Sequence, residues 1–219
     1  TEESFIPLLP ISFFHQSFYA MKWISYAVYA LLFTPVLFVA CTEDDDVPPI
    51  ENQEETITHV SLTYTPEGGG NPVTATWVDA DGEGSGDPVL TDISLAANTT
   101  YTLDIALVNA LDPDNQEDIT EEVEEEGDEH MFFFGWTEGL FLDPTGNGNI
   151  DNRADPVKYE DSLDDNGYPV GVETEWTTGE VAMGTFQIIL KHQPAIKSAT
   201  SNTSDGETDV DVTWDISIQ

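Results

Sequence analysis

Residues 208–218 read TDVDVTWDISI, and this stretch decides the fold class. Apolar and polar residues alternate strictly along it: Val210, Val212, Trp214, Ile216 and Ile218 against Asp209, Asp211, Thr213, Asp215 and Ser217. Successive side chains of a β-strand point to opposite faces of its sheet, so this alternation predicts one buried and one exposed face. We therefore expect a half-buried β-strand at residues 208–218.

Further strand-like segments precede this one along the chain. They are residues 56–65, 72–78, 88–95, 99–108, 130–134, 156–159, 170–177 and 184–192. Turn pairs such as Asp81-Gly82, Asn166-Gly167 and Asp205-Gly206 lie between them. Short strands at this spacing predict an all-β fold, and we expect an antiparallel immunoglobulin-like β-sandwich.

One short acidic helix is expected in the middle of the chain. Asp118 can cap its first turn, with Glu121 three residues later, and Gly127 weakens the helix at its other end. Ile119 and Val123 form its only apolar pair, so we expect it to lie across one edge of a sheet.

The first forty residues differ from the rest and resemble a targeting segment. From Met21 the chain reads MKWISYAVYALLFTPVLFVAC, which is a basic residue, an apolar run and small residues before Cys41. This order is typical of a secretory signal peptide. Residues 1–40 are therefore expected to comprise an extension upstream of Met21 and a lipoprotein signal peptide.

The residues around Cys41 resemble the lipobox of bacterial lipoproteins, here Phe38-Val39-Ala40-Cys41. This resemblance implies cleavage before Cys41, its lipidation, and a membrane anchor. Residues 41–55 are acidic and contain Pro48-Pro49, so they predict a flexible tether before a β-sandwich domain at 56–219. The run Cys41-Thr-Glu-Asp-Asp-Asp resembles the export signal of Bacteroidota surface lipoproteins, which implies a surface-exposed outer-membrane lipoprotein. An ordinary acidic tether facing the periplasm is the alternative.

The chain is strongly acidic, with 43 Asp and Glu residues, five Lys and Arg residues and a formal net charge of −38. Such a charge repels the phosphates of nucleic acids, so no nucleic-acid partner is expected. It attracts cations or basic partner surfaces, although its role can also be limited to solubility. Cys41 is the single cysteine, so an intramolecular disulfide cannot form.

One cluster has the residue types of a transition-metal site. Glu122, Glu126 and His130 follow at intervals of four and would share one helical face if the helix continued through Gly127. Glu129 lies beside them, and His192 is a further ligand if the fold brings it near. Neutral imidazole with carboxylates suits zinc or another divalent transition metal, whereas a solvated acidic helix is the alternative.

Three acidic turns are candidates for calcium binding. The segment 143–151 follows the order of an EF-hand loop in its first part but has Ala154 where the last ligand is expected. The calcium candidates are Asp79, Asp81, Glu83, Asp143, Asn147, Asp151, Asp161 and Asp164. Asp, Asn and Gly are also ordinary turn residues, so a purely structural role is the alternative.

Four segments together resemble one family. They are EDITEEVEEEGDEHMFFF (117–134), VGVETEWTTG (170–179), LKHQPAIKS (190–198) and GETDVDVTWDISIQ (206–219). They look like Bacteroidota envelope lipoproteins often labelled "type 1 periplasmic binding fold superfamily protein", whose genes lie beside TonB-dependent receptors. The resemblance implies an accessory role in uptake, with such a receptor as partner.

The sequence predicts no enzyme, because it has no Gly-x-Ser-x-Gly elbow, no His-Glu-x-x-His and no phosphate-binding loop. The leading hypothesis is a non-enzymatic lipoprotein that binds a metal or a metal complex for a TonB-dependent transporter. The alternative is a structural or adhesion module on the cell surface, braced by calcium.

Overall fold

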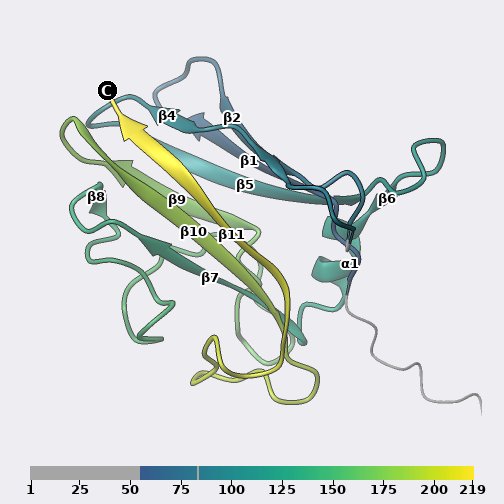
Figure 1. Cartoon of the computed structure of the whole chain (residues 1–219). Helices are drawn as coiled ribbons and strands as arrows, with labels where there is room; N and C mark the ends of the chain where they lie inside the picture. The colour runs from purple at the N-terminus through teal and green to yellow at the C-terminus, as the bar shows by residue number, and fades with distance from the viewer. Residues whose placement is uncertain (1–54, 83) are drawn as a thin grey trace, which may run out of the picture. The chain divides into compact units, whose positions relative to one another are not determined.

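Residues 55–82 and 84–219 are described by the computed structural model of the chain (Figure 1). The expected signal peptide, Cys41 and all of the expected tether except Glu55 lie outside these residues, as does Glu83. None of the described helical residues forms a helix with the length and apolar character needed to cross a bilayer.

The larger of two β-sheets contains seven of the eleven described strands. In spatial order it consists of β3 (Val89–Leu90), β2 (Val73–Val78), β1 (His59–Pro66), β5 (Thr100–Asn109), β9 (Glu173–Thr178) and β8 (Phe141–Asp143), while β6 (Glu117–Asp118) pairs with β5. All neighbours in this sheet are antiparallel.

The smaller sheet contains the segment that decided the fold class. Its order is β4 (Ile93–Leu95), β11 (Glu207–Ile218), β10 (Ala182–His192) and β7 (His130–Trp136). β10 pairs antiparallel with both β11 and β7, whereas β4 runs parallel to β11. The described part of the chain is therefore an all-β fold with two sheets, as predicted, but its pairing is not antiparallel throughout.

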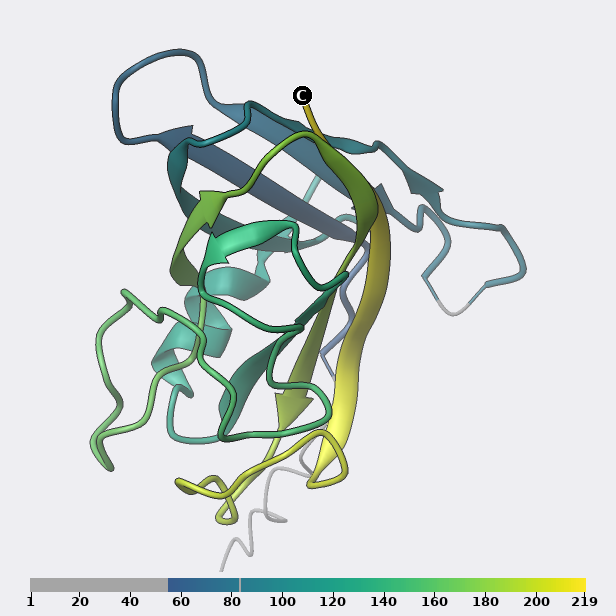
Figure 2. The same cartoon turned by 90° about the vertical axis from the view of Figure 1, so that its left-hand side faces the viewer.

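The two sheets face each other (Figures 1 and 2), and the side chains on their inner faces share one apolar core. The alternation in β11 is confirmed, since Trp214 is 1% exposed and lies inside, whereas Asp211 and Asp215 on the same strand are exposed. Trp176 of the larger sheet packs at 5.6 Å between ring centroids against Phe134 of the smaller sheet. Burying such large side chains removes much apolar surface from water and stabilises the face-to-face packing.

The expected helix is present as α1 (Ile119–Glu125) and lies at the end of the sheets where β5 finishes and β7 begins (Figure 1). The Asp118 side chain caps it by accepting a hydrogen bond from the backbone N–H of Thr120 at 3.0 Å. Ile119 and Val123 are buried against the sheets. The rest of the helix surface is acidic, and no basic residue lies in its last turn.

Some expected strands differ from those found. The segment 88–95 divides into β3 and β4, which belong to different sheets, because the chain crosses from one sheet to the other between them. In the segment 156–159 only Tyr159 makes an isolated bridge, to Thr174, and β6 and β8 were not predicted. A short apolar run indicates a strand but not its partner, so sequence alone does not separate these cases.

Candidate metal centre

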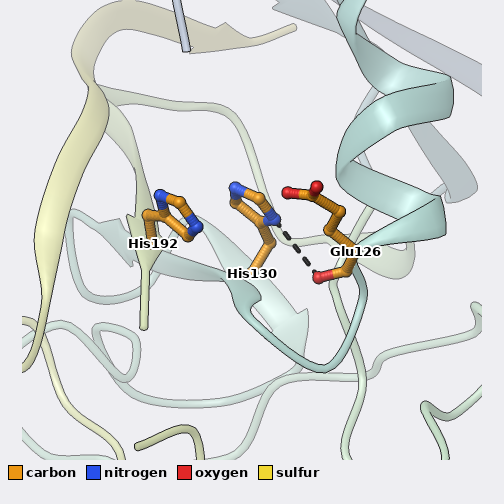
Figure 3. Close-up of side chains that lie close together, drawn as sticks. All are labelled: Glu126, His130 and His192. Atoms are coloured by element: carbon orange, nitrogen blue, oxygen red, sulfur yellow. Dashed lines mark hydrogen bonds between the residues drawn. The ribbon is translucent and has the colours of Figure 1, made fainter. Parts of the chain in front are cut away.

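Three elements bring the candidate site together at the α1 end of the sheets. Glu126 is the C-cap of α1, His130 is the first residue of β7, and His192 is the last residue of β10. His130 and His192 lie directly opposite each other on neighbouring antiparallel strands. Their rings stack with centroids 4.3 Å apart and planes at 9°, and the carboxylate of Glu126 lies beside them (Figure 3).

The route from Glu126 to His130 is a turn and not a continued helix. The condition for one helical face from Glu122 to His130, a helix that continues through Gly127, is therefore not met, because the helix ends at Glu125. The turn still keeps the two residues close, since the backbone N–H of His130 donates to the carbonyl oxygen of Glu126 at 3.2 Å. A spacing of four residues thus places them together for a different reason from the one expected.

His130 is a buried, neutral imidazole. Burial, and then the neighbouring His192, lower the pKa of His130 to about 4. Its Nδ1 lies 3.3 Å from the carbonyl oxygen of Glu126, which can only accept, so Nδ1 carries the proton. Nε2 then presents a lone pair, makes no hydrogen bond to any described residue, and lies 3.8 Å from Oδ2 of Asp209. This nitrogen is in the protonation state that a metal ion requires.

Carboxylates crowd around the two rings. Oε2 of Glu129 lies 3.3 Å from Nε2 of His192. Partial burial, and then the negative charges of Glu129 and Glu122, raise the pKa of Glu126. Burial, and then Glu122 and Glu126, likewise raise the pKa of Glu55. A cation placed here would relieve this repulsion.

The geometry of the cluster could hold a metal ion. Glu126, His130 and His192 each offer one ligand atom, and these atoms lie within 4.8 Å of one another. Ligand atoms of a tetrahedral zinc ion are about 3.3 Å apart, given bonds of about 2.0–2.1 Å. The ligand atoms must therefore approach one another by up to about 1.5 Å, which requires the side chains to rotate and the stacked rings to tilt.

Comparisons of the chain with protein-family models, curated proteins and solved structures gave no match.

The predicted transition-metal residues divide into three groups. Glu126, His130 and His192 come together as one possible site. Glu129 contacts His192 directly, whereas Glu122 acts on Glu126 through its charge. His192 was expected to join only if the fold brought it near, and the register of β7 and β10 does so.

Sequence reasoning missed Asp209. Its place in the alternation of residues 208–218 predicted the exposed face of the strand, yet its side chain has an exposed fraction of 0%. The register of β10 and β11 shifts between Leu190 and Lys191, which makes Asp209 the inserted residue of a β-bulge. A bulge leaves no signal in an alternating sequence, so the pattern could not identify this carboxylate.

Several predicted calcium ligands form ion pairs or hydrogen bonds with other groups of the protein. Asp143 forms an ion pair with Lys158 at 2.6 Å, and Asp164 forms one with Lys197 at 2.9 Å. Asp161 accepts hydrogen bonds from the backbone N–H groups of residues 170 and 171. These contacts brace the long connections around β8 and β9.

Of the remaining predicted calcium ligands in the described part of the chain, Asp79 is partly buried, whereas Asp81, Asn147 and Asp151 are exposed. Asp81 accepts from the backbone N–H of Gly86 at 3.1 Å, and Asp79 precedes it in the same turn. Asn147 donates to Asp151 at 3.3 Å. Within residues 55–82 and 84–219, none of these carboxylates joins a group of three converging acidic or histidine ligands. Calcium binding in these loops stays a prediction.

Proposed function

We propose that Glu126, His130 and His192 bind a divalent transition metal, and that the chain is a non-enzymatic binding protein that captures a metal or a metal complex. The observation that carries this proposal is the stacked pair of buried imidazoles beside a carboxylate. Two histidines and one carboxylate are three protein ligands, which leaves a fourth position on a tetrahedral metal ion for a further ligand.

The ligand set favours zinc over calcium at this cluster. Imidazole nitrogen is a common ligand of zinc, copper and iron, whereas calcium takes six to eight oxygen atoms. Because its pKa is lowered to about 4, His130 has no proton to lose when a metal binds at neutral pH.

Groups around the ligands support the same function. The Glu126 carbonyl oxygen lies at Nδ1 of His130, and Glu129 lies at Nε2 of His192. Hydrogen bonds of this kind fix the tautomer and the orientation of metal-bound histidines, and their loss lowers affinity by about 10–100-fold. In the metal-bound state we expect Nδ1 of His130 to keep its proton and its bond to the carbonyl.

We further propose that this domain is anchored in the outer membrane by lipidated Cys41 and serves a TonB-dependent receptor. The support comes from the sequence alone, namely the signal-like residues 21–40, the lipobox-like residues before Cys41 and the family resemblance. Several acyl chains on one cysteine would give a durable anchor, at about 0.8 kcal/mol per buried methylene. A receptor nearby would take the metal from the domain.

The immunoglobulin-like class of the fold is also a proposal. It is supported by the order β1-β5-β9-β8 in one sheet and β11-β10-β7 in the other, which corresponds to the ABED and GFC orders of immunoglobulin domains. In this assignment β2 and β3 extend the first sheet, and β4 is an added parallel edge strand of the second.

Calorimetric titration tests the metal proposal. The full chain, kept in detergent, would be titrated with zinc, copper(II), iron(II) and calcium in separate experiments. We expect a transition metal to bind with a dissociation constant well below 1 mM and with a stoichiometry near one. If no transition metal binds more tightly than 1 mM, the proposal is overturned.

A further inference from the structure

Asp209 is carried into the interior by the β-bulge of β11. Opposite Leu190 stands Val210, but opposite the next residue, Lys191, stands Thr208. Val210 faces the core at 5% exposure, whereas Thr208 is exposed and accepts a hydrogen bond from Nζ of Lys191 at 2.7 Å. In a regular strand residues 208 and 210 would share a face, so the extra residue between them reverses the alternation.

The bulge brings the carboxylate of Asp209 to the ring of His130. Oδ2 of Asp209 lies 3.8 Å from Nε2 of His130, and both side chains have an exposed fraction of 0%. This nitrogen is the one that presents a lone pair, because Nδ1 faces the carbonyl oxygen of Glu126 (Figure 3). Two electron-rich atoms that face each other inside a protein are stabilised by a cation between them.

The separation of these two atoms is close to that of two ligands on one metal ion. With metal–ligand bonds of about 2.0–2.1 Å, neighbouring ligands of a tetrahedral ion are about 3.3 Å apart. The observed 3.8 Å needs a closing movement of about half an ångström. Asp209 does not belong to the group whose ligand atoms lie within 4.8 Å of one another, so Glu126 and His192 must also move for all four residues to bind one ion.

A hollow of about 370 Å³ lies beside Asp209. Glu55 and Asp79 line it together with Asp209. The same Glu55 lies near enough to Glu122, Glu126 and His192 for their charges to act on its carboxyl group. An acidic surface of this kind raises the local concentration of cations at the opening.

We infer that Asp209 is the fourth protein ligand of the metal. The ion would lie between the carboxylate of Asp209 and Nε2 of His130. This inference rests on the proposed function and completes its ligand set as two histidines and two carboxylates. Four protein ligands are typical of a closed zinc site, whereas three leave one position open to water. The site would therefore hold its metal tightly and release it only when the surrounding strands move.

Two substitutions at one position test this inference, with Asp215 as the matched control because it is an exposed aspartate on the same strand. Asp209→Asn keeps the size of the side chain but removes its charge, and we expect it to weaken zinc binding by the full chain at least tenfold. Asp215→Asn should bind as the wild type does. Circular dichroism of the metal-free proteins checks that both fold.

Asp209→Cys supplies a direct signature of coordination. With cobalt(II) as the probe, a thiolate at position 209 that binds the metal gives a thiolate-to-cobalt charge-transfer band, which neither the wild type nor Asp215→Cys should show. This band decides the outcome even if Asp209→Asn fails to fold. If Asp209→Asn binds zinc like the wild type and Asp209→Cys lacks the band, Asp209 is no ligand, although the three-residue site stands. If the wild type binds no metal, the proposed function and this inference both fall.

Discussion

His130 and His192 stand opposite each other on neighbouring strands, and their rings stack at 4.3 Å between centroids with planes at 9°. Two rings in this arrangement cannot both be protonated without repulsion, and the pKa of His130 is lowered partly by His192. The cross-strand register therefore supplies two imidazoles to one place. It does so at the end of the core, where α1 adds Glu126.

Removal of either ring should abolish tight metal binding. We expect His130→Ala and His192→Ala each to raise the dissociation constant for zinc by at least 100-fold, since each variant loses one nitrogen ligand. His59→Ala removes the histidine at the start of β1, which is not one of the three proposed ligands, and should leave the affinity unchanged. Equal zinc affinity in all four proteins, measured by calorimetry, would refute the assignment of the two histidines.

The buried imidazole of His130 should make the metal-free protein less stable in mild acid. Its pKa is about 4 in the folded chain and about 6.5 in the unfolded chain. Between these two values the unfolded state binds a proton that the native state does not bind. Stability is then fully present above pH 6.5 and is lost as the pH falls toward 4. Between pH 7 and pH 5.5 we expect a loss of about 1 kcal/mol from this group. Urea unfolding of the wild type and of His130→Gln gives the comparison, and an identical pH dependence in both would contradict the prediction.

The pair of Lys197 and Asp164 should stabilise the turn that leads into the metal site. Nζ of Lys197 lies 2.9 Å from Asp164 and donates to the carbonyl oxygen of Gly127 at 2.5 Å, and its side chain is 1% exposed. Lys197→Ala should cost about 3–5 kcal/mol of unfolding free energy, because it leaves a carboxylate buried without its counter-ion.

The partly exposed Lys158 provides the control for this prediction. It pairs with Asp143 and Glu175, and its side chain is 37% exposed. Lys158→Ala should therefore cost only about 0–1 kcal/mol. Urea unfolding measures both variants. An equal loss of unfolding free energy in Lys158→Ala and Lys197→Ala would contradict the prediction that the buried pair of Lys197 and Asp164 contributes more.

Trp176 should be the most costly single truncation in the core. Its ring contacts aromatic rings from both sheets at centroid distances of 4.8–5.6 Å, and those rings are Phe134, Trp136, Phe141 and Phe186. Trp176→Ala should lower the unfolding free energy by about 3–5 kcal/mol. Met183→Ala, at a side chain that is 82% exposed, should change it by less than about 0.5 kcal/mol. Thermal denaturation compares the two variants. A lower melting temperature for Met183→Ala than for Trp176→Ala would contradict this prediction.

The sequence predicted those features that depend on local patterns. The alternation around Trp214 identified β11, and Asp118 identified the start of α1. The parallel pairing of Ile93 with Ile216 has no local signal, because it depends on which sheet the chain joins after β3. Turn chemistry and periodicity fix elements, whereas partners are fixed by packing in three dimensions.

The candidate site was predicted in part and for partly wrong reasons. The types and spacing of Glu126 and His130 were informative, although a turn and not a helix connects them. His192 joins them because β7 and β10 pair in one register among several possible. Asp209 was invisible because its inward direction comes from a bulge, which an alternating pattern cannot show.

Diffraction at the zinc absorption edge, from crystals of the full chain grown with zinc, tests the central claim most directly. We expect one anomalous peak at the α1 end of the sheets, about 2.0–2.1 Å from one ring nitrogen of His130 and one of His192. A carboxylate oxygen of Glu126 should also lie within bonding distance of this peak. Peaks confined to surface carboxylates, with the two rings still stacked and no density between them, would contradict it.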